Sequence, residues 1–135
     1  MYRVVIGKQI TRIMHHFRNL TTWKKAMELT DITYQYCKGL PKDERYNLID
    51  QINRSSCSVP SNIAEGSGKR SPKQFAEFLS VSISSAYELE TQLLICQRRN
   101  YGDYSILNAA LALTIEIQKM LYALRNKILR QSEDD

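Results

Sequence analysis

The sequence predicts an all-α protein, an up-down-up-down bundle of four helices. Apolar residues recur at spacings of three and four in four successive segments. Only 5 Gly and 3 Pro occur in 135 residues, and most of them lie between those segments, so the connections are short. This length fits one domain with one core. We expect a basic N-terminal extension over residues 1–16, the bundle over 17–130 and an acidic tail over 131–135.

The extension is weakly patterned. Tyr2, Val4, Val5 and Ile6 could form a short strand, but we find no partner strand for them elsewhere in the sequence. Met14 offers a second candidate start of translation.

The first helix is expected over residues 22–39, with Thr21 or Thr22 as its cap and with Gly39 and Pro41 ending it. Its spacing predicts a buried face composed of Trp23, Ala26, Met27, Thr30, Tyr34 and Cys37.

The second helix is expected to begin around Asp43 and Glu44, because acidic residues suit a first turn, and to stop at Gly66 and Gly68. Pro60 should kink it. Its expected apolar face consists of Leu48, Ile52, Val59 and Ile63.

A strong helix start marks the third helix. Ser71 can cap it, Pro72 suits the first helical position, and Gln74 can complete a capping box. This helix should reach about Asn100. Gly102 and Asp103 then separate it from a fourth helix, from near Tyr104 to Arg130, whose apolar positions are Leu107, Ala110, Leu113, Ile117, Leu121, Leu124 and Ile128.

The third and fourth helices are apolar on more than one face, which leaves two interpretations open. One is generous core packing and the other is an oligomer interface. Small residues that would permit close helix approach are Ser80, Ser82, Ser84 and Ser85.

A polar line runs along the second helix at spacings of three, four, four and three, through Gln51, Arg54, Ser58, Asn62 and Glu65. These residues share one face next to the apolar face, so the charged members would need partners, for which Glu88 and Glu90 are candidates. We interpret this structural polar network as an inter-helix set that fixes the register of the bundle, with a ligand site as the alternative.

The formal net charge is +5, and residues 1–27 hold six Lys and Arg residues and no acid. In an up-down-up-down bundle, the loop between the second and third helices lies at the same end as both termini. That end should gather Lys24, Lys25, Lys69, Arg70, Lys73, Arg125, Lys127 and Arg130. Phosphates would meet these side chains and the helix start at Pro72, which favours sequence-tolerant binding of RNA or DNA.

Motifs for catalysis or cofactors are missing from the sequence, and we expect neither an enzyme nor a metal or cofactor site. The two histidines, His15 and His16, are adjacent and precede the bundle, so they cannot form the Glu-x-x-His pairs of di-iron bundles. The loop from Gly66 to Ser71 fails the phosphate-binding pattern because Ile63 stands where a Gly is needed.

The cysteines Cys37, Cys57 and Cys96 are odd in number and far apart, and we interpret them as reduced core thiols. The sequence has no long apolar segment, so we expect a cytoplasmic protein without membrane contact.

Several motifs together resemble those of a known family. They are Phe17-x-x-Leu20-x-x-Trp23-x-x-Ala26, Pro41-x-x-Glu44-x-Tyr46-x-Leu48, Gln51-x-x-Arg54, Phe75-x-x-Phe78-Leu79, Ser85-Ala86-Tyr87-Glu88-Leu89-Glu90 and above all Ser58-Val59-Pro60-Ser61-Asn62-Ile63-Ala64-Glu65-Gly66. The sequence is similar over about residues 17–130 to the bacterial four-helix-bundle proteins named for open reading frames in intervening sequences of 23S ribosomal RNA genes. Two departures are Ser84, where that family usually has Gly, and residues 1–16, which have no regular counterpart.

The resemblance implies a bundle that associates as a homopentamer, with a proposed nucleic-acid role and no established enzyme activity. A more distant resemblance, to the accessory protein of diversity-generating retroelements, implies a basic surface used beside a reverse transcriptase. We therefore expect a non-enzymatic protein that binds nucleic acid as an oligomer. The alternative is an adaptor or scaffold for an unidentified protein partner, without direct contact to nucleic acid.

Overall fold

The computed structural model describes residues 2–6, 9–13 and 16–134, with side chains described for residues 16–133. Met14, His15 and Asp135 lie outside the described residues. Four long α-helices form the body of the protein, as the sequence predicts. In chain order the elements are β1 (Tyr2–Ile6), β2 (Gln9–Ile13), the 3₁₀ turn η1 (Phe17–Asn19), α1 (Thr21–Cys37), the 3₁₀ turn η2 (Lys42–Glu44), α2 (Leu48–Ser67), α3 (Pro72–Arg98) and α4 (Tyr104–Asp134).

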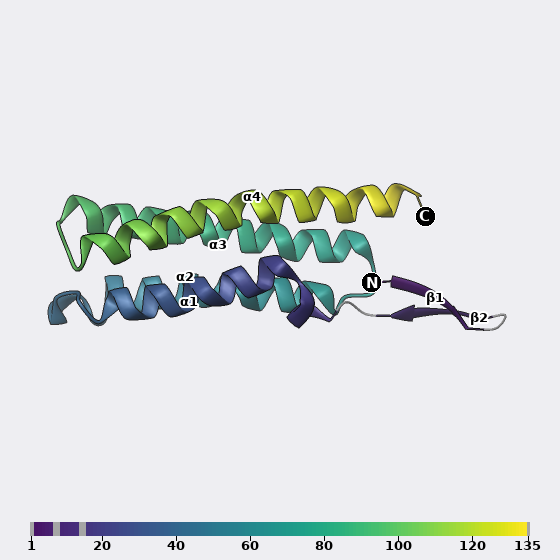
Figure 1. The fold of residues 1–135 in the computed structure, drawn as a ribbon, viewed down its shortest axis with the longest axis horizontal. Coiled ribbons are helices and arrows are strands. Elements are labelled where there is room, and N and C mark those ends of the chain that lie inside the picture. Colours follow the sequence, from purple (N-terminus) through teal and green to yellow (C-terminus); the bar gives the residue numbers. More distant parts are fainter. Residues whose placement is uncertain (1, 7–8, 14–15, 135) are drawn as a thin grey trace.

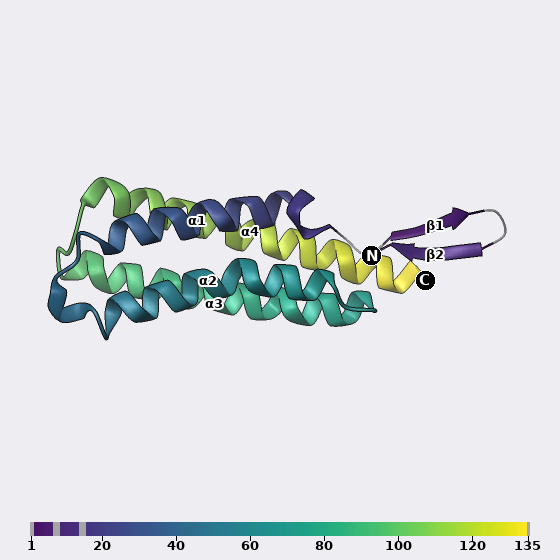
Figure 2. The same cartoon turned by 90° about the horizontal axis from the view of Figure 1, so that it is seen from below.

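The helices lie side by side along one long axis (Figures 1 and 2). Helix α3 packs against α2 and α4, and α1 packs against α2 and α4, so that the four helices enclose one core. The α1–α2 and α3–α4 connections lie at one end, while the α2–α3 connection and the end of α4 lie at the other (Figures 1 and 2). We call the second of these the loop-and-tail end.

The N-terminal extension contains a β-hairpin, so the expectation that its strand has no partner is wrong. Strand β1 pairs antiparallel with β2, with Tyr2 opposite Ile13 and Ile6 opposite Gln9. The partner begins only three residues after β1 ends, and its β-branched residues Ile10, Thr11 and Ile13 were the missed signal.

The buried face of α1 differs in phase from the predicted one. Met27 and Tyr34 are 40% and 61% exposed, whereas Leu29 and Tyr36 are fully buried beside Ala26. In α2 and α4 the predicted apolar positions are buried, except Leu124, which is half-buried. The phase of α1 was hard to predict because its buried face includes the polar residues Thr22 and Thr33, whereas the larger Met27 and Tyr34 are exposed.

Helix α2 begins at Leu48, four residues after the predicted start at Asp43 and Glu44, which instead belong to η2. Asn47 breaks the helix there, with φ −129° and ψ −100°. Glu44 Oε2 accepts hydrogen bonds from Asn47 Nδ2 at 3.0 Å and from the backbone N–H of Leu48 at 3.4 Å. The acid therefore caps α2 from outside and does not belong to its first turn.

Pro60 lies within α2 and is buried. The hydroxyl group of Ser82 on α3 donates a 2.8 Å hydrogen bond to the carbonyl oxygen of the preceding residue, Val59. This bond ties α3 to α2 beside the proline, where the ladder of backbone hydrogen bonds lacks one donor.

Helix α3 begins as predicted: Ser71 Oγ accepts a 3.1 Å hydrogen bond from the N–H of Gln74, and Pro72 occupies the first turn. The α3–α4 connection uses left-handed backbone at Asn100 (φ 57°) and Gly102 (φ 73°). Helix α4 continues four residues past the predicted end at Arg130, because no Gly or Pro follows Gly102 to stop it. No helix in the described part of the chain carries an apolar run that could cross a lipid bilayer.

Candidate nucleic-acid interface

The eight basic residues predicted for the interface lie on three segments: the first turns of α1, the α2–α3 connection with the start of α3, and the last turns of α4. The second and third segments belong to the loop-and-tail end, and the first turns of α1 lie further back along the bundle, with Lys25 beside Glu116 of α4 (Figures 1 and 2). The exposed side chains among them are Lys24, Arg70, Lys73, Lys127 and Arg130. Lys25, Lys69 and Arg125 are half-buried.

Two of the half-buried cations have local partners. Lys25 Nζ lies 3.7 Å from Glu116 Oε1 on α4, so that its charge is partly neutralised. Lys69 Nζ lies 4.9 Å from the ring centroid of Phe78, a cation–π contact between the α2–α3 connection and α3. Both of these side chains are therefore held in place by contacts within the protein.

Lys73 and Arg125 come together around a shallow hollow between α3 and α4. It has a volume of about 270 Å³, and Glu77 and Ser80 also line it. Arg125 Nη1 donates a 3.1 Å hydrogen bond to Ser80 Oγ, and the guanidinium lies 4.6 Å from the ring centroid of Tyr122. Because Glu77 contributes a carboxylate, this hollow is of mixed charge, and Arg125 also helps hold α4 to α3.

The connection between α2 and α3 is tightly packed at Gly66. A Cβ atom there would lie 2.7 Å from Phe78 Cβ and 2.9 Å from Phe75 Cδ1. Helix α2 ends at Ser67, with Gly68 as its cap residue. The glycine-rich stretch thus ends one helix and lets the next approach closely, which confirms the helix-terminating interpretation over a nucleotide-binding loop.

The polar line of α2 lies largely in solvent, contrary to prediction. Arg54 is 79% exposed, and its ion-pair partner in the described part of the chain is Asp50, at 3.7 Å one turn earlier. Gln51 is exposed and donates to Asn47 Oδ1 at 2.9 Å, and Glu65 is also exposed. These residues are too far round the helix from the core to need buried partners.

Ser58 and Asn62 are the members of the line that turn towards α3. Ser58 Oγ lies 2.7 Å from Ser85 Oγ, and Asn62 Nδ2 donates to Ser58 Oγ at 2.9 Å. This part of the line links α2 to α3 through Ser85, and not through the expected partners Glu88 and Glu90.

Glu88 and Glu90 were predicted as partners for Arg54, and the structure gives both carboxylates glutamine partners. Gln92 Nε2 donates to Glu88 Oε1 at 3.3 Å within α3. Gln118 Nε2 on α4 donates to Glu90 Oε1 at 2.8 Å. Glu90 therefore links α3 to α4 and not α3 to α2.

Buried polar residues that we did not single out in the sequence complete the contacts between helices. The hydroxyl groups of Thr33 on α1 and Ser56 on α2 lie 2.7 Å apart. Ser55 Oγ donates to Gln92 Oε1 at 2.7 Å. Their signal was available, since Ser55 and Ser56 fall on the apolar stripe between Ile52 and Val59.

The three cysteines are free thiols in different environments. Cys37 and Cys96 are buried, as predicted, but Cys57 is exposed and is not a core residue. Burial, reinforced by the neighbouring Cys96, raises the pKa of the Cys37 thiol to about 11. Burial also raises the pKa values of Cys96 and of the Tyr36 hydroxyl group. The buried thiols are therefore protonated at neutral pH and are poor nucleophiles.

No group of three or more His, Cys, Asp and Glu side chains is placed to hold a metal ion among residues 16–133. His16 is exposed in front of η1, while its neighbour His15 lies outside the described residues.

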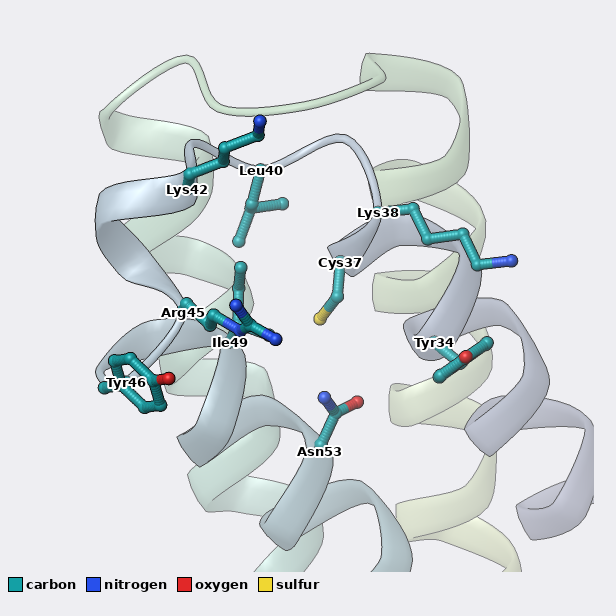
Figure 3. A pocket seen from close by; sticks show the side chains of 9 residues that line it. All are labelled: Tyr34, Cys37, Lys38, Leu40, Lys42, Arg45, Tyr46, Ile49 and Asn53. Carbon is teal, nitrogen blue, oxygen red and sulfur yellow. The ribbon is translucent and has the colours of Figure 1, made fainter.

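A second surface, which we did not predict, lies at the opposite end of the bundle (Figure 3). It is a pocket of about 730 Å³, lined by Tyr34, Cys37, Lys38, Leu40, Lys42, Arg45, Tyr46, Ile49 and Asn53. The sequence signal was the occurrence of three basic residues, Lys38, Lys42 and Arg45, between Tyr34 and Tyr46.

The outer face of α3 and α4 carries the apolar surface that the sequence left open to two interpretations. Large side chains exposed on this side of the two helices are Tyr87, Leu94, Tyr104, Ile115, Tyr122 and Leu129. The hydroxyl groups of Tyr87 and Tyr122 lie 3.5 Å apart, so the two helices share this face. Core packing within one chain therefore does not account for all the apolar residues of these helices.

Comparison with known proteins matches residues 18–123 to the model of the 23S rRNA-intervening sequence protein family. The chain belongs to this family. Among solved structures, a protein of unknown function from the S23 ribosomal protein family of Bacteroides thetaiotaomicron has a TM-score of 0.72 and 24% sequence identity, covering 78% of this chain and 98% of its own. That likeness shows a shared fold. No curated protein matches the chain in sequence.

The part matched to the 23S rRNA-intervening sequence family includes the α2–α3 connection and the whole of the second pocket. It does not include the hairpin or the last turns of α4, where Arg125, Lys127 and Arg130 lie. Part of the basic surface thus lies beyond the region that the family model matches.

Proposed function

We propose that this protein binds RNA or DNA through the phosphate backbone, without sequence preference and without an enzymatic step, and that it acts as an oligomer. The observation that carries the proposal is the exposure of Arg70, Lys73, Lys127 and Arg130 on two segments of the loop-and-tail end, with Lys24 exposed further back on α1. Cations of this kind contribute binding by displacing counterions from the nucleic acid, irrespective of base sequence.

The start of α3 supports the same interpretation. Arg70 and Lys73 flank the capped N-terminus at Ser71 and Pro72. Helix N-termini attract phosphate groups, so backbone phosphates there would meet both the positive end of the helix and two exposed cations.

The oligomeric part of the proposal is supported by the apolar outer face of α3 and α4. Association through this face would bury Tyr87, Tyr122 and Leu129, which are exposed in one chain. A homopentamer, as in the family resemblance, would repeat the basic end around a ring. Linked copies raise the effective concentration of weak contacts, which suits non-specific binding to a long polyanion.

A salt-titrated binding assay with structured RNA and with duplex DNA tests the proposal. Charge reversal of Arg70 and Lys73 to Glu should weaken binding strongly and reduce the slope of log affinity against log salt by about 2. The matched control reverses the charge of Arg98 and Arg99, two exposed arginines at the opposite end of the bundle. Absence of any affinity at low salt would overturn the proposal, as would equal losses in the two double variants.

The apolar outer face also favours a second candidate, an adaptor or scaffold that binds a protein partner. In this alternative the basic end is only solvated. This alternative predicts that charge reversal at Lys69, Arg70 and Lys73 leaves cellular function intact and that one partner protein still co-purifies. Polar substitutions on the outer face should abolish both the cellular function and the co-purification.

A further inference from the structure

The pocket at the opposite end is formed by the last turn of α1, the connection that follows it, η2 and the first turns of α2 (Figure 3). Its volume of about 730 Å³ falls in the range of sites that hold small molecules. It is separate from the basic loop-and-tail end and shares no residue with it.

The charge of this pocket is of one sign. Lys38, Lys42 and Arg45 line it, and none of its nine lining side chains, in the part of the chain that the structure describes, is a carboxylate. Figure 3 shows the Arg45 guanidinium directed towards the middle of the pocket, with the Asn53 amide facing it from below and the Lys42 ammonium at the rim. A forked guanidinium beside an amide donor fits a phosphate group, which can accept several hydrogen bonds at once.

Two tyrosines stand on opposite sides of the pocket (Figure 3). Tyr34 is 61% exposed and Tyr46 is 87% exposed, although the protein has a core that could hold aromatic rings. Each contacts a cation: Lys38 Nζ lies 4.9 Å from the Tyr34 ring centroid, and Arg45 Cζ lies 5.7 Å from that of Tyr46. Exposed rings beside cations are the arrangement on which nucleic-acid bases stack.

The floor between the tyrosines is apolar. Cys37 and Leu40 are buried, Ile49 is half-buried, and the Cys37 sulfur faces the open space (Figure 3). The thiol is protonated at neutral pH, because burial raises its pKa to about 11. It therefore offers a planar ligand an uncharged surface and does not act as a nucleophile.

We propose that this pocket binds one phosphorylated nucleoside, with the phosphate held by Arg45 and Asn53 and the base placed against Tyr34 or Tyr46. The ligand could be a free nucleotide or the 5′-terminal nucleotide of a single strand, since both present the same phosphate and ring. The proposal stands apart from backbone binding at the other end, because the two surfaces have no residue in common.

The direct test is to measure the binding of adenosine 5′-monophosphate to the full chain by calorimetry and by NMR of the tyrosine rings. Adenosine and inorganic phosphate should each bind at least about 10-fold more weakly, because each supplies half of the contacts. Arg45→Gln should lower affinity at least about 10-fold, and so should Tyr34→Ala or Tyr46→Ala, whichever removes the ring on which the base stacks. The matched controls Arg98→Gln and Tyr104→Ala, at exposed positions outside the pocket, should bind as the unaltered protein does.

Two further ligands distinguish the sources of the nucleotide. Tighter binding of a 5′-phosphorylated oligonucleotide than of the same strand with a 5′-hydroxyl end, and than of the mononucleotide, assigns the pocket to strand ends. Equal binding of the mononucleotide and the phosphorylated strand assigns it to free nucleotides. No saturable binding of either, or undiminished binding by Arg45→Gln, would overturn the proposal.

The Arg70→Glu/Lys73→Glu variant separates this pocket from the proposed function. It should lose affinity for long RNA and duplex DNA and keep its affinity for the mononucleotide. Loss of mononucleotide binding in that variant would show that the nucleotide binds at the loop-and-tail end, and would contradict the proposal that it binds in the pocket.

Discussion

The hydroxyl group of Ser55 on α2 donates a 2.7 Å hydrogen bond to Oε1 of Gln92 on α3, and both side chains are buried. It links the two helices whose contact is the most extensive in the bundle. Gln92 in turn donates to Glu88 at the outer edge of α3, so this bond connects the core to the surface.

Substitution Ser55→Ala removes this bond and leaves the Gln92 carbonyl oxygen buried without that donor. We expect the free energy of unfolding to fall by about 1–2 kcal/mol, measured by urea denaturation. Ser84→Ala is the matched control, because Ser84 is exposed on a helix and its hydroxyl group bonds only its own helix, to Ser80 O. If both variants are equally stable, the bond contributes nothing to the fold.

Gly66 provides a second prediction, in which the usual effect of alanine is reversed. Alanine normally stabilises a helix interior by up to about 1 kcal/mol over glycine. Here the new Cβ would lie 2.7 Å from Phe78 Cβ and 3.3 Å from the backbone oxygen of Phe75. Because α2 and α3 must separate to admit it, Gly66→Ala should lower the free energy of unfolding by about 1–3 kcal/mol.

Gly39→Ala is the control for this prediction. Its Cβ would meet no atom closer than 3.6 Å among those described, an ordinary contact distance. Thermal unfolding of the two variants should therefore differ by several degrees. Equal melting temperatures would show that α2 and α3 adjust to the methyl group freely.

The sequence predicted the start of a helix well where neighbouring residues alone determine it. Ser71 and Pro72 start α3 as expected, because capping needs only neighbours in the chain. The start of α2 was wrong because Glu44 caps from outside the helix, and an acid in the first turn cannot be told from one before it by composition. The hairpin was missed because strand pairing depends on a partner, which we sought too far along the chain.

The candidate sites were less predictable because they depend on which side of a helix faces the core. A small error in the phase of α1 placed Tyr34 inside, whereas it is exposed and lines a pocket. The exposure of Arg70 in the α2–α3 connection was easier to predict, since loops between helices lie in solvent whatever the phase.

Arg54 gives a prediction on which the sequence and the structure disagree. As a buried member of a register network, its loss would be strongly destabilising. In the structure it is 79% exposed and pairs with Asp50 on the same helix at 3.7 Å. We expect Arg54→Ala to change the free energy of unfolding by less than about 0.5 kcal/mol in urea denaturation, since exposed pairs contribute little. A decrease in the free energy of unfolding of more than about 2 kcal/mol would instead support the buried register network.

The buried thiols predict a loss of stability in alkaline solution. In the folded chain, burial raises the pKa of Cys37 from 9.0 to about 11, whereas in the unfolded chain the thiol ionises near its ordinary value. The stabilisation is therefore fully present below about pH 9 and is lost as the pH rises towards 11. By pH 10, this group should reduce the free energy of unfolding by about 1 kcal/mol relative to pH 8.

Urea denaturation at pH 8 and pH 10, with a thiol reductant present, measures this effect. Cys37→Ala should make stability less dependent on pH, although Cys96 and Tyr36, whose pKa values burial also raises, keep part of the dependence. Cys57→Ala is the control and should leave the dependence unchanged, because Cys57 is exposed. If the Cys37 and Cys57 variants respond alike to pH, the thiol of Cys37 is not the group that makes the folded state sensitive to alkali.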